Sequence, residues 1–337
     1  MKKNNFFIIS ALLIICLFLG LASVSATSSD IYVSPSGNDS SNNGTVDSPY
    51  QSIGKAVNQS SNSSNVNIYL DEGTYRGKGN NTEIVINKAH ISQGGSISII
   101  GKGKDKTFID GDSISFIFDI KADSIVHLYN LTIRNCKNDT GGAITTSGNL
   151  IIDNCVFTGS NATSVYYGGG AIYSNGGNIT ILNSIFDNCY SKNLGGAIYT
   201  SGALVKINNS NFTNNIASSN IVYLHNVYWD YDLGYNTAFN SSITNCYFIN
   251  NTLTSTSSYI SSILFMSGGS LINNTFINCS AENSTGPSVL SIQGYNKEGV
   301  YLKNTTIINC PNKNNQTFIN IEGIVRNLNL TFLNNQT

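Results

Sequence analysis

The sequence predicts an all-β fold: a right-handed parallel β-helix of about ten coils, with three short strands in each coil and an N-terminal cap at its start. Two recurring phrases, and the short apolar runs that join them, carry this prediction. The step between copies is roughly 24 to 36 residues, which is typical of solenoids whose units bury apolar side chains only against their neighbours.

The first phrase runs from an Asn through a small polar residue and an apolar or aromatic residue to a second Asn. Clear copies occupy residues 183–189, 209–215, 245–251 and 273–279, and looser copies begin at Asn130, Asn154, Asn304 and Asn329. Asn tolerates the left-handed backbone of a sharp corner, and its amide can bond to the Asn of the next coil. We therefore expect stacked Asn corners, with Phe186, Phe212 and Phe248 stacked inside.

The second phrase, Gly-Gly-Ala-Ile, lies between copies of the first, at residues 141–144, 169–172 and 195–198. A turn rich in Asn and Gly and a third apolar run, such as Ile179 to Leu182, follow it. These runs are too short for helices, and their apolar residues alternate with polar ones, which indicates strands. Leucine-rich and helical solenoids fit less well, because neither a Leu consensus nor a helical period is present.

Residues 1–26 have the features of a secretory signal peptide. Lys2 and Lys3 precede an apolar run over residues 6–21, and the small residues that end at Ala26 suit cleavage. An uncleaved anchor is the alternative, but the run is short for a membrane span of about 20 residues. We expect cleavage near Ala26 and a mature chain that is secreted or held at the cell surface without a membrane span.

Two segments follow the signal peptide: residues 27–65 as a cap segment and residues 66–337 as the β-helix. Within the first, residues 48–57 predict a short helix with Ile53 and Val57 on one face. A cap at this end would cover the strand edge of the first coil, which otherwise invites aggregation.

The balance of charge excludes one class of partner. The chain has 18 Lys and Arg against 19 Asp and Glu, and charged residues make up 11% of it. Nucleic-acid binders concentrate basic residues to neutralise phosphates, and no basic run occurs here. We therefore expect no nucleic-acid partner.

The opening residues 31–56 resemble the start of many pectin-lyase-like β-helix proteins. The Gly-Gly-Ala-Ile phrase and the Phe-x-x-Asn phrases at 212–215, 248–251 and 332–335 are similar to repeats of the chlamydial polymorphic outer-membrane proteins. From Asp30 onward, the Asn-rich, weakly charged chain looks most like the adhesin-like β-helix proteins of methanogenic archaea. That resemblance implies a cell-surface role in adhesion or wall structure.

Many members of that group carry further C-terminal modules for surface attachment. This sequence stops at Thr337 with no cap or anchor visible, so a short secreted member and a truncated one both remain open.

A polysaccharide lyase or glycoside hydrolase is the alternative function, because the pectin-lyase-like fold hosts many. Such hydrolases need paired carboxylates, and the Gly-His-Gly and Arg-x-Lys phrases of the fold's hydrolases do not occur. The densest acidic group is Asp105, Asp110, Asp112, Asp119 and Asp123. We interpret Asp110-Gly111-Asp112 as a turn whose Asp side chain forms a hydrogen bond to its own backbone. The alternative is a metal or catalytic site.

The remaining polar residues do not predict a reactive centre. Arg76, Arg134 and Arg326 stand far apart in the sequence. His90, His127 and His225 lack the spacing of zinc ligands. We therefore expect no catalytic residue, no metal and no cofactor.

An insertion from His225 to Asn240 interrupts the repeat and holds the only Trp of the chain. Aromatic rings beside carboxylates suit binding to a glycan or to a partner protein, whereas the alternative is a loop that covers its own coil. The candidate binding residues are Tyr228, Trp229, Asp230, Tyr231, Asp232 and Tyr235.

Six cysteines each follow an Asn in the repeats: Cys136, Cys155, Cys189, Cys246, Cys279 and Cys310. They fit two interpretations, small buried side chains in a turn stack or disulfides between neighbouring coils. Cys279 and Cys310 are the candidate disulfide pair, because equivalent Cα atoms of adjacent coils lie about 5 Å apart, within disulfide range.

Taken together, the residues predict an adhesin-like, non-catalytic and monomeric β-helix whose loops bind cell-surface glycans or proteins. The rigid ladder would fix the loops, and the loops would carry specificity.

Overall fold

The computed structural model describes residues 28–60, 65–87, 89–90, 94–230, 235–254, 261–281, 289–294, 299–311, 317–326 and 328–334. For residues 229–230 and 235–237 only the backbone is described. The predicted signal peptide, residues 1–26, and its cleavage site lie outside these ranges.

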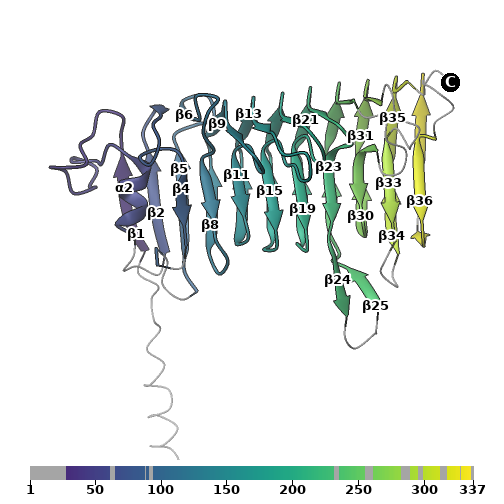
Figure 1. The fold of residues 1–337 in the computed structure, drawn as a ribbon, viewed down its shortest axis with the longest axis horizontal. Helices are drawn as coiled ribbons and strands as arrows, with labels where there is room; N and C mark the ends of the chain where they lie inside the picture. Colours follow the sequence, from purple (N-terminus) through teal and green to yellow (C-terminus); the bar gives the residue numbers. More distant parts are fainter. Residues whose placement is uncertain are drawn as a thin grey trace, which may run out of the picture.

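The chain forms a right-handed parallel β-helix, as predicted, in which successive coils lie side by side along a rod (Figure 1). Within a full coil the chain passes through four sheets in turn, named here sheets 1 to 4. Sheet 1 consists of β1 (Ser28–Val33), β2 (Asn65–Leu70), β5 (Ser96–Gly101), β8 (Ile125–Tyr129), β12 (Asn149–Asp153), β16 (Ile179–Leu182), β20 (Val205–Asn208), β26 (Ser242–Thr244), β30 (Gly269–Ile272), β34 (Val300–Lys303) and β37 (Val325–Arg326).

Sheet 2 follows sheet 1 across the first corner of each coil. It consists of β3 (Gly73–Tyr75), β6 (Thr107–Asp110), β9 (Thr132–Arg134), β13 (Val156–Thr158), β17 (Ile185–Asp187), β21 (Asn211–Thr213), β27 (Tyr247–Ile249), β31 (Thr275–Ile277), β35 (Thr305–Ile308) and β38 (Leu330–Leu333). Sheet 4 consists of β4 (Ile84–Ile86), β7 (Phe118–Ile120), β11 (Ile144–Thr146), β15 (Ile172–Asn175), β19 (Ile198–Ser201), β23 (Asn220–His225), β29 (Ser262–Met266), β33 (Leu290–Gln293) and β36 (Ile319–Glu322).

Sheets 1, 2 and 4 correspond to the three strands expected in each coil, and sheet 3 is an addition. Its strands have two residues each and lie between sheets 2 and 4, where they are too short for an alternating pattern to reveal them. They are β10 (Lys137–Asn138), β14 (Asn161–Ala162), β18 (Tyr190–Ser191), β22 (Ile216–Ala217), β28 (Thr252–Leu253) and β32 (Ser280–Ala281).

Two further elements lie outside the four sheets. The helix α2 (Ile53–Asn58) confirms the short helix expected near the N-terminal end, and its residues Ile53, Ala56 and Val57 are buried. The side chain of Ser52 caps it by accepting the N–H of Lys55. The second element is an antiparallel hairpin of β24 (Val227–Asp230) and β25 (Tyr235–Ala238). Among the described residues, no helix is long and apolar enough to cross a membrane.

The core is a set of columns that run along the rod. Phe157, Phe186, Phe212, Phe248 and Phe276 pair in register in sheet 2 and are 0% exposed. Their ring centroids are 4.6 to 5.1 Å apart with nearly parallel planes. The expected stacking is therefore confirmed, and each ring contacts another ring on both sides except at the two ends.

The corner Asn residues adopt the left-handed backbone that the sequence predicted. Asn183, Asn209 and Asn245 have φ of 51°, 52° and 55°. Their side chains also form a ladder along the rod: Nδ2 of Asn209 donates to Oδ1 of Asn183 at 2.7 Å, and Nδ2 of Asn273 donates to Oδ1 of Asn245 at 3.0 Å. Asn thus meets two requirements at one position.

The residue after most corner Asn residues is a buried Ser, Asn or Cys, and several of these accept a backbone hydrogen bond from the preceding coil. Oγ of Ser184 accepts the N–H of Cys155 at 3.1 Å, and Oδ1 of Asn215 accepts the N–H of Cys189 at 2.9 Å. A corner interrupts the regular ladder of backbone hydrogen bonds, and an unsatisfied buried N–H would be costly. These positions therefore favour a small side chain that can accept a hydrogen bond, although Leu131 occupies one of them.

We predict that Phe212→Ala lowers the free energy of unfolding by about 3 to 5 kcal/mol, because it opens a gap inside a fully buried ring stack. Tyr247→Ala, on the outer side of the same sheet and 47% exposed, should change it by less than about 0.5 kcal/mol. Denaturant titration followed by circular dichroism measures both. Equal losses would contradict the inward stack.

We predict that Asn209→Gly is more stable than Asn209→Ala by about 1 kcal/mol, because glycine adopts positive φ without the steric cost that Ala has there. Both variants lose the amide that donates to Asn183, so their difference isolates the backbone term. Thermal unfolding of the pair measures it, and an Ala variant at least as stable as the Gly variant would rule out this explanation.

Candidate functional site

The outer face of sheet 4 carries a stripe of aromatic side chains. In register along the rod lie Tyr173, Tyr199, Tyr223 and Phe265, named here the aromatic stripe. Neighbouring ring centroids are 5.2, 5.1 and 4.7 Å apart. The residue before each ring points into the main core, so strand alternation places the ring on the outer side. The rings therefore form a cluster separate from the main core.

The local sequence explains why the stripe is so regular. Gly-Gly-Ala-Ile-Tyr occurs at residues 169–173 and again at 195–199. A Cβ on Gly170 would overlap the carbonyl oxygen of Gly196 in the next coil, so only glycine lets the two turns approach. Ala171 and Ile172 then enter the core, and strand alternation sends Tyr173 outward.

A loop from sheet 3 places two more tyrosines at the edge of the stripe. Tyr167 lies across the rings of Tyr173 and Tyr199, with centroid distances of 6.0 and 6.1 Å, and it is 50% exposed. Tyr166 beside it is 77% exposed. Nδ2 of Asn193 donates to the carbonyl oxygens of Val165 and Tyr166 at 2.9 and 3.0 Å, which holds the loop in place.

Two tyrosines of the stripe, Tyr173 and Tyr199, remain neutral phenols over a wide pH range. Burial raises the pKa of Tyr173 and Tyr199, and the neighbouring phenols raise it further. At the N-terminal end of the same column, Thr145 and Asp119 replace the rings, and Nζ of Lys121 lies 2.6 Å from Oδ2 of Asp119. The face thus changes from aromatic to polar along the rod.

The predicted binding loop is the hairpin β24–β25, which begins just after the stripe strand β23 ends. Figure 1 shows it extending beyond the stack of coils. Tyr228 is 42% exposed, and its ring lies 4.8 Å from that of Phe239. Trp229, Asp230 and Tyr235 lie on its two strands, with their backbone alone described. Tyr231 and Asp232 lie outside the described residues.

The base of the hairpin is anchored by a buried polar group. Oδ1 of Asn226 accepts the hydroxyl of Thr200 at 2.8 Å, and its Nδ2 lies 3.3 Å from Oγ of Ser241. Asn226 is 2% exposed. The amide thus links the residue just before β24 to the preceding coil and to Ser241, on the other side of the insertion.

The acidic turn that includes Asp110 is an ion-pair cluster that sequence spacing did not reveal. Asp110 is buried, with Oδ2 at 2.9 Å from Nη2 of Arg76 and 2.7 Å from Nε of Arg134. The predicted turn is present too, because the N–H of Asp112 donates to Oδ1 of Asp110 at 3.0 Å. Burial acts to raise the pKa of Asp110, but hydrogen bonds from Arg134, the Asp112 N–H and Asn135 outweigh it, so the pKa lies below its usual value.

The histidines lie in separate environments. His127 is on the outer face of sheet 1, with Nδ1 at 3.4 Å from Oγ of Ser98, whereas the ring of His225 lies near Tyr223 at the end of β23. Burial lowers the pKa of His90, His127 and His225. Within the described ranges, no three His, Cys, Asp or Glu side chains are grouped to hold a metal ion.

The cysteines occupy the buried acceptor positions after the corner Asn residues. No disulfide joins any of the six described cysteines, the candidate pair included. Instead, the N–H of Cys279 donates to Sγ of Cys310 at 3.4 Å, as equivalent groups do in other coils. Burial raises the pKa of Cys155 and Cys189 to about 12 and that of Cys246 to about 11.

Solved structures similar to this chain are pectin-lyase-like parallel β-helix proteins. A rhamnogalacturonan lyase is 15% identical, with 91% of this chain and 87% of that chain covered and a TM-score of 0.40. A pectate lyase is also 15% identical, with 91% and 79% covered and a TM-score of 0.38. The pectin methylesterase from Aspergillus niger is 14% identical, with 92% and 86% covered and a TM-score of 0.32.

No model of a protein family matches the chain, and no curated protein matches it. At such low identities the likeness to the solved structures concerns the fold alone.

We predict that the unfolded, unreduced mature protein titrates as six thiols, the number of cysteines in the repeats. In the folded protein, we expect Cys155, Cys189 and Cys246 to react with iodoacetamide roughly a hundredfold more slowly than an exposed cysteine, because burial raises their pKa and the thiolate is the reactive form. Four thiols after unfolding, with a cross-linked peptide containing Cys279 and Cys310, would establish the disulfide instead.

Proposed function

We propose that this chain is an exported, non-catalytic, adhesin-like β-helix that binds glycans on the outer face of sheet 4. The aromatic stripe is the observation that carries the proposal. Tyr199 and Tyr223 are only 8% exposed and Phe265 1%, so the accessible part consists of the half-buried Tyr173 with Tyr166 and Tyr167 at its edge. The polar pair of Asp119 and Lys121 continues the same face. Sugars present C–H faces and hydroxyls together, so a surface of this mixed kind suits them.

The arrangement of the loops also supports a binding role. Tyr167 lies at the edge of the stripe, before the start of β15. The hairpin begins after the end of the stripe strand β23. Both are held by hydrogen bonds from buried or neighbouring side chains, which limits the entropy lost when a ligand binds. A preformed surface of this kind can recognise a glycan without a conformational change.

The ion pairs support a structural rather than a catalytic role for the acidic turn. Asp110 already accepts hydrogen bonds from Arg76, Arg134 and Asn135. A general base must be available to abstract a proton from substrate, and this carboxylate is committed to its partners. Export rests on residues 1–26, whose basic start, apolar run and small residues are typical of a signal peptide.

We predict that the mature protein is retained in affinity electrophoresis by at least one cell-surface polysaccharide, and that Tyr167→Ala weakens retention roughly tenfold, which corresponds to loss of about 1.4 kcal/mol of contact energy. Tyr247→Ala, an exposed tyrosine on sheet 2, should leave retention unchanged. Circular dichroism checks that both variants keep the fold.

Two further readouts separate the alternatives. Because the chain has one Trp, at position 229, a change in tryptophan fluorescence on binding would extend the site to the hairpin. Equal effects of the two substitutions would refute the stripe as the binding site. Release of shorter saccharides from the bound polysaccharide would favour the lyase or hydrolase alternative.

A further inference from the structure

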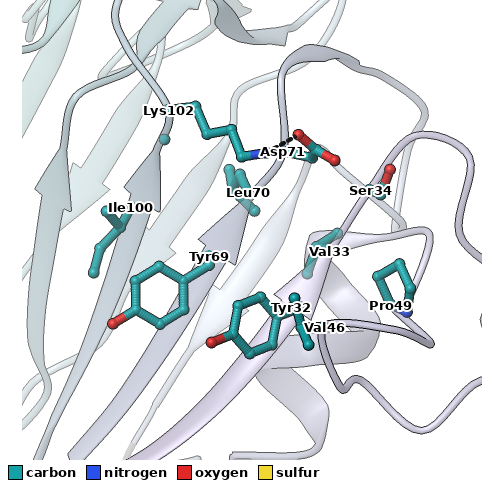
Figure 2. A pocket seen from close by; sticks show the side chains of 11 residues that line it. Tyr32, Val33, Ser34, Val46, Pro49, Tyr69, Leu70, Asp71, Ile100 and Lys102 are labelled. Atoms are coloured by element: carbon teal, nitrogen blue, oxygen red, sulfur yellow. Dashed lines mark ion pairs between the residues drawn. The ribbon is translucent and has the colours of Figure 1, made fainter.

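A cleft lies on the outer side of sheet 1 near the N-terminal end, on a different sheet from the aromatic stripe. It crosses the ends of three neighbouring strands, β1, β2 and β5, and Figure 2 shows the side chains that line it. Tyr32, Tyr69 and Ile100 stand in register along one side. The two tyrosine rings are stacked, with centroids 5.2 Å apart and planes 20° apart.

The opposite side of this cleft is polar. Asp71 and Lys102 follow β2 and β5 directly, and Nζ of Lys102 lies 2.6 Å from Oδ1 of Asp71. Both side chains remain accessible, because 40% of the Asp71 side chain and 61% of the Lys102 side chain are exposed. A ligand in the cleft would therefore meet aromatic carbon on one side and a charged donor and acceptor on the other (Figure 2).

A loop closes the N-terminal end of the cleft with Val46 and Pro49. The loop is tied to β1, because the N–H of Tyr32 donates to the carbonyl oxygen of Gly44 at 2.8 Å, and the N–H of Tyr50 donates to the carbonyl oxygen of Tyr32 at 2.9 Å. The walls are thus set by the backbone of the first coils, and the cleft is formed before any ligand arrives.

Size and charge together restrict what fits. The cavity measures about 200 Å³, below the roughly 300 to 1,000 Å³ of sites for drug-sized ligands, so it accepts a single ring. The charges of Asp71 and Lys102 cancel, and an anion or a cation would have to compete with the partner that each already has. Neighbouring hydroxyls can instead donate to Asp71 and accept from Lys102 without separating them.

We propose that this cleft binds one uncharged sugar residue, with its C–H edge against Tyr32, Tyr69 and Ile100 and adjacent hydroxyls on Asp71 and Lys102. The site is independent of the aromatic stripe, since it lies on a different sheet and in the first coils. It would give the rod a contact with a glycan end or branch in addition to the contact along sheet 4.

The pair should keep its charges over a broad pH range. The hydrogen bond from Lys102 lowers the pKa of Asp71, and the same bond raises the pKa of Lys102. The carboxylate of Asp71 therefore persists as pH falls past the ordinary Asp pKa of about 4. The ammonium of Lys102 persists as pH rises past the ordinary Lys pKa of about 10.4. Sugar binding should accordingly be constant between about pH 5 and pH 9 and should weaken once Asp71 is protonated.

Saturation-transfer NMR on the mature protein tests the proposal with the methyl glycosides of glucose, galactose, mannose and xylose, and with methyl glucuronoside and methyl glucosaminide as charged counterparts. We expect at least one neutral glycoside to bind more tightly than either charged one. Tyr69→Ala should weaken it at least tenfold. Tyr129→Ala, the next tyrosine of the same outer column and outside the cleft, should not.

Lys102→Met adds a variant at an exposed position that leaves the core untouched, and it should also weaken binding at least tenfold. Binding of none of the neutral glycosides, preference for a charged one, or binding unaffected by Lys102→Met would overturn the proposal. The two proposals can be tested independently. Tyr167→Ala should not alter glycoside binding in the cleft, and Lys102→Met should not alter polysaccharide retention by the stripe.

Discussion

In-register parallel pairing between coils is the constraint on which the rest of the molecule depends. Each residue lies directly over its equivalent in the next coil, at a spacing of about 4.8 Å. A side-chain type that recurs in the repeat therefore becomes a continuous column. Inside, this yields the stack through Phe186 and Phe212. On the outer side of sheet 4, the same rule turns recurring tyrosines into an ordered ring stack, as at Tyr173 and Tyr199.

The corners show why the composition is so unusual. Each corner of a coil needs a residue with a left-handed backbone, and the side chain at that position also forms a hydrogen bond to the next coil. Glycine could adopt the backbone but could not form the bond, so Asn recurs there. At most corners the next residue is small and buried, and in several coils it accepts an N–H bond. Ser, Asn and Cys all suit such a position, which explains why these three residue types replace one another there.

The sequence could predict the features that depend on residue type and spacing within a single repeat. The Phe stack, the Asn corners and the helix at Ile53 follow from spacing and residue type, and the structure confirms them. The aromatic stripe was missed although its signal is present, in the Tyr that follows Gly-Gly-Ala-Ile at 173 and 199. The Arg76 and Asp110 pair could not be seen, because 34 residues separate them and only the register of adjacent coils joins them.

A fixed ring stack with the exposed Tyr166 and Tyr167 at its edge gives the proposed binding role its physical basis. Hydroxyl-radical footprinting of the mature protein with a bound polysaccharide tests that claim most directly, because it reads the accessibility of each tyrosine side chain. The account predicts slower oxidation at Tyr166 and Tyr167, with unchanged rates at Tyr190, Tyr247 and Tyr301, which are exposed on other sheets. Protection of the latter three, with Tyr166 and Tyr167 unaffected, would contradict it.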